Sequence, residues 1–192
     1  MDQSADGFPA NKLSVITFNY DRSLEHYFRT AFANTHGMDY AKATEIVDRI
    51  SIIHLHGQLG KLPPSKGAGR EYGPEFSKYN LDACVGNDGI KIVSEASPDT
   101  PDFIRAKDLL DAAQSVVFLG FGYDYLNMDR LGIAGLARKA RQENFPRITG
   151  TAFGLSDMEK AQIQNKFHLD NHAFGHSRFD ALEFLRETVP IA

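Results

Sequence analysis

Short apolar runs alternate with amphipathic segments along this chain. The runs Leu13–Phe18, Ser51–Leu55 and Val116–Leu119 are continuous and contain β-branched residues, which is typical of buried strands. Further strands are expected at residues 90–93 and 148–155. Apolar positions spaced by three and four predict helices between these runs. The predicted helices cover residues 21–37, 40–49, 101–113, 127–142, 158–167 and 179–187. Strands that alternate with helices predict an α/β fold, with a three-layer parallel sheet covered by helices on both faces.

The length of the chain predicts one domain. Its 192 residues are enough for one buried core and too few for two comfortable domains, so residues 12–192 are expected to form a single domain. Residues 1–11 are expected to be a disordered leader. Residues 61–87 are rich in Gly, Pro, Ser and Lys without a clear period, which predicts a long excursion or lid. Within it, the segment Gly67–Arg70 resembles a phosphate cradle, but it does not follow an expected strand, so a flexible loop is the favoured interpretation.

Composition narrows the classes of partner. The net charge is −4 and no basic run is present, so nucleic acid is not an expected partner. The polar start is unlike a secretory signal, and no stretch reaches the about 18 apolar residues of a membrane helix. We therefore expect a cytoplasmic protein. The single cysteine, Cys84, excludes an internal disulfide and a zinc site built on cysteine pairs.

Three polar clusters follow expected strands, where ligands bind in parallel sheets. They are Asn19–Asp21, His56–Gly57 and Gly120–Asp124. Taken alone, Asn19 and Asp21 also suit a turn and a helix N-cap. His54 and His56 alternate along a strand, but no third ligand is near and no metal site is expected; His54 is expected to be buried and hydrogen-bonded.

Three further histidines recur every four residues near the end of the chain. They are His168, His172 and His176. They span the end of a helix and an expected short strand, so we interpret them as surface or packing residues.

The order and spacing of these motifs resemble those of the SIR2-like family. The family's T-x-N-x-D motif appears as Thr17-Phe18-Asn19-Tyr20-Asp21, and its H-G motif appears as His56-Gly57. The segment Gly120–Tyr123, followed by Asn127, resembles the family's late strand and turn. The resemblance covers roughly residues 13 to 185.

This resemblance implies a Rossmann-like NAD site and cleavage of the nicotinamide glycosidic bond to give nicotinamide and ADP-ribose. It implies that Asn19 orients a water or the ribose, that Asp21 holds the nicotinamide side, and that His56 acts as the base. The expected nucleotide-binding residues are Thr17, Phe18, Tyr20, Gly57, Gly120, Phe121, Gly122, Tyr123 and Asn127. Imidazole suits the role because its ordinary pKa lies near neutrality.

Two departures from the family pattern shape the prediction. Sirtuin deacylases carry a four-cysteine zinc module, which a chain with one cysteine cannot build, so the resemblance points to the zinc-less NAD hydrolases of bacterial defence systems. The family's glycine-rich phosphate turn lies well upstream of the asparagine motif, whereas only 18 residues precede Asn19. A sheet truncated at its N-terminal βα unit is therefore expected.

An unrelated α/β domain, whose apparent motifs are ordinary strand-end residues, is an alternative to the resemblance itself. Two further alternatives follow from the truncation. The first is a degenerate SIR2-like module that binds a nucleotide or a protein without turnover. The second concerns partners: an open sheet edge favours a homo-oligomer or a complementing protein chain.

Overall fold

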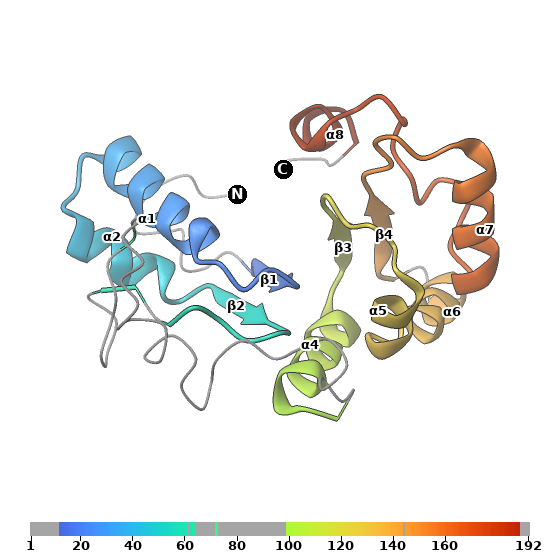
Figure 1. Ribbon diagram of the computed structural model, residues 1–192, viewed down its shortest axis with the longest axis horizontal. Coiled ribbons are helices and arrows are strands. Elements are labelled where there is room, and N and C mark those ends of the chain that lie inside the picture. The colour runs from blue at the N-terminus through green and yellow to red at the C-terminus, as the bar shows by residue number, and fades with distance from the viewer. Residues whose placement is uncertain (1–11, 61, 64–71, 73–98, 144, 189–192) are drawn as a thin grey trace, which may run out of the picture. The chain divides into compact units, whose positions relative to one another are not determined.

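The computed structural model describes residues 12–60, 62–63, 72, 99–143 and 145–188. These residues form seven helices and four short strands, and the strands pair into two parallel two-stranded sheets (Figure 1). The chain divides into two compact units, residues 1–102 and 103–192, which we call the N-terminal and C-terminal units. The α/β class expected from the sequence is confirmed.

The N-terminal unit is a pair of parallel strands joined by two helices. Its elements are β1 (Ser14–Thr17), α1 (Ser23–His36), α2 (Tyr40–Val47) and β2 (Ser51–His54). Position 17 of β1 lies opposite position 54 of β2, so both strands end at the same edge. Their C-terminal ends therefore bring two separate loops together.

Local signals explain where the helices of this unit begin and end. Gly37 has the left-handed φ of 59° that ends α1, and the Met38 N–H donates to the Ala33 carbonyl. Asp39 caps α2 by accepting from the Lys42 N–H at 2.7 Å. Both helices lie within two residues of the predicted bounds.

The C-terminal unit contains the second parallel pair. Its elements are α4 (Pro101–Ala112, whose first turn contains the unit boundary), β3 (Ser115–Phe118), α5 (Tyr125–Arg130), α6 (Ile133–Glu143), β4 (Arg147–Gly150), α7 (Asp157–Phe167) and α8 (Ala181–Thr188). The helices α5 and α6 connect β3 to β4. An isolated parallel bridge joins Gly150 to Phe174, close to the short strand expected there.

Two predicted elements of this unit are wrong in extent. The single helix expected over residues 127–142 is two helices, because Gly132 has a φ of 70° and breaks the chain between α5 and α6. The strand expected over residues 148–155 ends at Gly150. Beyond it the chain turns at Gly154, whose φ is 77°, and then enters α7.

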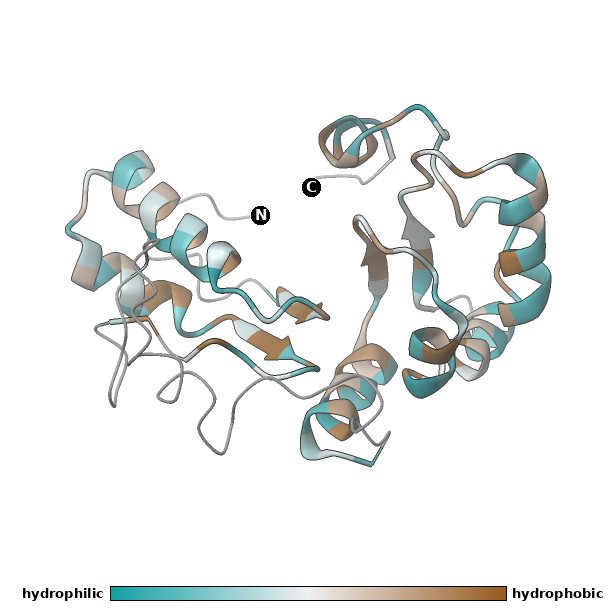
Figure 2. Ribbon diagram, in the orientation of Figure 1, coloured by the Kyte–Doolittle hydropathy of each residue, from teal (hydrophilic) through white to brown (hydrophobic). Residues whose placement is uncertain are grey.

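Apolar side chains fill the interior of each unit. Figure 2 shows strands β2 and β3 coloured as hydrophobic, whereas the helices carry both polar and apolar residues. The core of the N-terminal unit includes Ala43, Val47, Ile53 and Leu55, and that of the C-terminal unit includes Phe103, Met128, Ile133, Phe167 and Phe184.

Several predictions lie outside the described residues. These are the leader at residues 1–11, the strand at residues 90–93, the loop Gly67–Arg70 and most of the excursion at residues 61–87. In the part of the chain that is described, no helix is both long and apolar enough to cross a membrane.

Candidate functional site

Two turns meet at the C-terminal edge of the β1–β2 pair. The Leu55 N–H donates to the Thr17 carbonyl at 2.9 Å, and the Leu59 N–H donates to the Tyr20 carbonyl at 2.9 Å. The segments beyond both strands therefore stay side by side. This edge brings the predicted Asn19–Asp21 and His56–Gly57 motifs together within one unit.

The Asn19–Asp21 turn is held by short-range hydrogen bonds. The Asn19 N–H donates to Thr17 Oγ1 at 3.1 Å, and the Ser23 N–H donates to Asp21 Oδ1 at 2.8 Å. The expected N-cap is displaced by one residue, because Arg22 occupies that position and Asp21 reaches the helix from the residue before it. Asn19 and Tyr20 remain exposed.

The carboxylate of Asp21 is stabilised in its charged form. Hydrogen bonds from the Ser23 side chain and backbone, followed by the nearby positive charge of His54, lower the pKa of Asp21. Asp21 is therefore ionised at neutral pH. One of its oxygens is already used at the start of α1.

The His56–Gly57 turn has a packed histidine and a constrained glycine. The His56 side chain is 6% exposed, and its ring centroid lies 5.4 Å from that of Phe18 in a tilted arrangement. Gly57 has a φ of 80°, and its N–H donates to the His54 carbonyl at 3.2 Å. A residue with a Cβ is strained at this φ, which explains why glycine follows His56.

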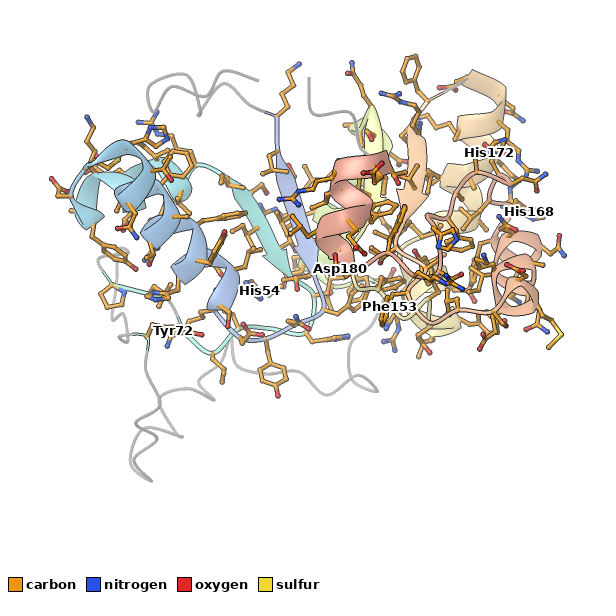
Figure 3. The ribbon with its side chains drawn as sticks, turned by 90° about the horizontal axis from the view of Figure 1, so that it is seen from above. His54, Tyr72, Phe153, His168, His172 and Asp180 are labelled. Atoms are coloured by element: carbon orange, nitrogen blue, oxygen red, sulfur yellow. The ribbon has the colours of Figure 1, made fainter. Side chains whose placement is uncertain are left out.

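His54 occupies a site that the sequence did not identify as functional. Its Nδ1 lies 2.7 Å from the Asn19 carbonyl oxygen, and its Nε2 lies 2.8 Å from Glu25 Oε1. The Gln58 side-chain amide donates to the same carboxylate oxygen. Figure 3 shows His54 where β2 meets the first turn of α1. The expectation that His54 is buried and hydrogen-bonded is confirmed, since its side chain is 7% exposed.

Tyr72, within the expected excursion, contacts the same helix. Its ring stacks on that of His26 with centroids 4.1 Å apart and planes 6° from parallel. Its hydroxyl lies 3.0 Å from Ser23 Oγ. This contact places one residue of the excursion over the first turn of α1, and no period in the sequence indicated it.

In the C-terminal unit, the turn after β3 is a packed corner. The Tyr123 hydroxyl donates to the Thr151 carbonyl at 2.8 Å, and the Gly120 N–H donates to Thr151 Oγ1 at 2.9 Å. The Tyr123 ring is 3% exposed, and this burial raises the pKa of its hydroxyl. The rings of Phe118, Phe121 and Tyr123 contact one another, with centroids 5.4 to 5.8 Å apart.

Gly122 and Asn127 complete the set predicted in this unit. Gly122 is exposed, and a side chain placed on it would meet open space. The Asn127 N–H donates to Asp124 Oδ1 at 3.0 Å, while its own Oδ1 is buried without a hydrogen-bond partner among the described residues. The contribution of the Gly120–Asn127 segment to a nucleotide site stays a prediction.

Two of the three histidines near the chain end, His168 and His172, line a cavity of the C-terminal unit. This cavity has a volume of about 740 Å³ and lies between α6, the start of β4 and residues 168–173. His168 and His172 are exposed and are labelled in Figure 3. Arg141 holds the cavity wall through a 3.1 Å hydrogen bond to Asp170 Oδ1 and a 3.0 Å hydrogen bond to the Leu169 carbonyl.

No group of three or more His, Cys, Asp or Glu side chains suited to a metal occurs among the residues that are described. Comparisons of the chain with protein-family models, with curated proteins and with solved structures find no match.

Proposed function

We propose that this chain is a SIR2-like NAD hydrolase of the zinc-less branch, which releases nicotinamide and ADP-ribose. One observation carries the proposal: the Asn19–Asp21 and His56–Gly57 turns meet at the C-terminal edge of a parallel strand pair. Ligands of open α/β sheets bind at this edge. The proposal includes a Rossmann-like arrangement of the sheet, a cytoplasmic location and a role in bacterial defence.

The reaction needs a leaving group, a nucleophile and a base. The bond between ribose C1′ and the nicotinamide nitrogen breaks, its electron pair neutralises the pyridinium, and water attacks C1′. The water proton passes to a base. The transition state gathers positive charge on the ribose, so polar groups that fix the sugar accelerate the step.

The residues of the edge fit these tasks. Asn19 is exposed and offers an amide that orients a water or a ribose hydroxyl. Asp21 is ionised, and its negative charge attracts the nicotinamide ring, which is a positively charged pyridinium until the glycosidic bond breaks. His56 is the base of the proposal, and Thr17, Phe18, Tyr20 and Gly57 shape the surrounding edge.

The test is product analysis with matched variants. Purified wild-type protein is incubated with NAD, and nicotinamide and ADP-ribose are separated by chromatography. His56→Asn is expected to reduce release of nicotinamide by about 100-fold or more, the scale of a lost general base. Asn19→Ala is expected to reduce it by about 100-fold, the scale of a misplaced nucleophile. His172→Ala, which changes an exposed histidine in the other unit, is the control and should retain the wild-type rate.

A second candidate is a nucleotide-binding module without turnover. It is favoured by the burial of His56 and by the use of an Asp21 oxygen at the start of α1, since both side chains already serve the fold. Calorimetric titration with NAD separates the candidates. Binding without release of nicotinamide supports the module, and release that survives His56→Asn rules out His56 as the base.

A further inference from the structure

We infer that His54 is a positioning residue that, as an imidazolium, fixes the Asn19–Asp21 turn to the first turn of α1. It joins three segments of the N-terminal unit: β2, which carries it, the turn that contains Asn19, and the helix that carries Glu25. The inference rests on the proposed function for its effect on turnover, but its structural part does not.

The hydrogen bonds define the charge of the ring. A backbone carbonyl cannot donate, so His54 Nδ1 must carry a proton to bond Asn19 at 2.7 Å. The carboxylate of Glu25 cannot donate either, so Nε2 must also carry a proton to bond it at 2.8 Å. A ring that is protonated on both nitrogens satisfies both contacts, whereas a neutral ring turns one lone pair toward an oxygen.

The surroundings of Glu25 reinforce this state. Its carboxylate is 13% exposed, and its Oε2 is buried with no hydrogen-bond partner in the described part of the chain. A buried carboxylate needs a positive partner. The Gln58 amide nitrogen also donates to Oε1 and lies 3.3 Å from His54 Nε2; with Nε2 protonated, both nitrogens are donors that share this one carboxylate oxygen and do not bond each other.

The surroundings of His54 favour its protonated form, so the stabilisation that this form provides depends on pH. Burial lowers the pKa of His54, but the hydrogen bonds to Glu25 and Asn19 and the negative charges of Glu25 and Asp21 outweigh it and raise that pKa above 6.5. The contribution of the charged ring to stability is therefore complete below pH 6.5, and it is lost as the pH rises through the raised pKa.

This arrangement bears on the proposed reaction through Asn19. The backbone carbonyl that His54 binds belongs to the same residue whose side chain orients the water or the ribose. Loss of the proton leaves one N–H for two acceptors, so the ring can no longer hold both the Asn19 carbonyl and the Glu25 carboxylate. Turnover should fall more than substrate binding, because orientation of the nucleophile is needed most in the transition state.

Two variants test the inference. His54→Phe keeps a planar ring and removes both hydrogen bonds. Glu25→Gln keeps the size of the side chain and allows a hydrogen bond to a neutral imidazole, while it removes the charge. If His54→Phe fails to fold, Glu25→Gln still separates charge from packing.

Two measurements need no substrate. In an NMR titration, the His54 ring of the wild type should titrate above pH 6.5, and in Glu25→Gln its midpoint should move to lower pH. In thermal unfolding, the melting temperature of the wild type should exceed that of Glu25→Gln by the largest margin at pH 6 and by the smallest at pH 9. A midpoint at or below 6.5, or a stability difference that does not change with pH, overturns the inference.

The third measurement is the pH profile of NAD cleavage. We expect the wild-type kcat to fall as the pH rises through the His54 midpoint, with KM changing by less than about threefold, and His54→Phe to show a low kcat at every pH. A kcat of His54→Phe equal to the wild-type value overturns the positioning role. Failure of the wild type to bind or cleave NAD overturns the proposed function, while the titration and unfolding results still decide the role of His54.

Discussion

The histidines at the end of β2 differ in what surrounds them, although they are only two residues apart. His54 lies between two oxygen acceptors, whereas His56 packs beside the ring of Phe18. The strand ends at His54, so His56 belongs to a turn and the alternation of a strand no longer sets its direction. Substitution of His54 and substitution of His56 should therefore have different consequences.

Truncation of His56 should destabilise the fold as well as stop the proposed reaction. The side chain is almost fully buried, so His56→Ala should lower the free energy of unfolding by about 1–3 kcal/mol. Urea unfolding measures this loss. The exposed His172, changed to Ala, should stay within about 0.5 kcal/mol of the wild type. Equal losses for both variants would contradict the packed position of His56.

Gly57 is constrained by its backbone. Its φ of 80° is a conformation that L side chains rarely adopt, so Gly57→Ala should cost about 1–3 kcal/mol of stability. Gly135 lies inside α6 with open space around it, and Gly135→Ala should instead stabilise by about 0.5–1 kcal/mol. Chemical denaturation of both variants checks the opposite signs, and a neutral Gly57→Ala would show that the turn relaxes.

At the scale of elements, signals within a few residues were predictable and longer contacts were not. The S-x-x-E pattern of Ser156 and Glu159 is such a local signal, and it forms the capping box that opens α7. The break at Gly132 was missed because helical spacing continues across it, and a lone glycine inside such a pattern does not by itself end a helix. The partners of His54 were missed because they come from the turn after β1 and from α1, which only the folded chain brings near.

Loss of the cap should weaken α7 measurably. Ser156 Oγ accepts from the Glu159 N–H at 3.2 Å, and Glu159 Oε2 accepts from the Ser156 N–H at 2.8 Å. Ser156→Ala should lower the free energy of unfolding by about 1 kcal/mol, and Ser156→Thr should lower it by much less. Chemical denaturation compares the two; an equal loss for both would show that the hydroxyl does not act as the cap.

The same contacts make the stability of α7 depend on pH in the acidic range. Hydrogen bonds from the backbone and side chain of Ser156 lower the pKa of Glu159. The resulting stabilisation is present above pH 4.5 and is lost as the pH falls through the lowered pKa. In thermal unfolding, the difference in melting temperature between the wild type and Ser156→Ala should therefore narrow at low pH to what the bond from the Glu159 N–H to Ser156 Oγ contributes.

At the scale of the whole chain, the same strand-helix-strand unit occurs twice. The β1–β2 and β3–β4 pairs are each parallel and each joined by two helices. The sequence predicted the alternation of strands and helices, but not which strands pair, since pairing is a long-range choice that short apolar runs do not specify. A two-stranded pair is marginal by itself, so each unit depends on its helices as well: α2 supplies Ala43, Ile46 and Val47 in the N-terminal unit, and helices supply most of the described core of the C-terminal unit.

Ligand binding should be visible as stabilisation of the protein. A nucleotide that binds only the folded state raises stability by about 2.7 kcal/mol at 100 times its dissociation constant. NAD is consumed if the protein cleaves it, so ADP-ribose, which lacks the reacting bond, is the better ligand for unfolding experiments. A shift of the midpoint with both nucleotides, reduced in Asn19→Ala, would support a nucleotide site at the C-terminal edge of β1 and β2. The absence of any shift at millimolar NAD and ADP-ribose would argue against both the hydrolase and the nucleotide-binding module, because both require the folded chain to hold the nucleotide.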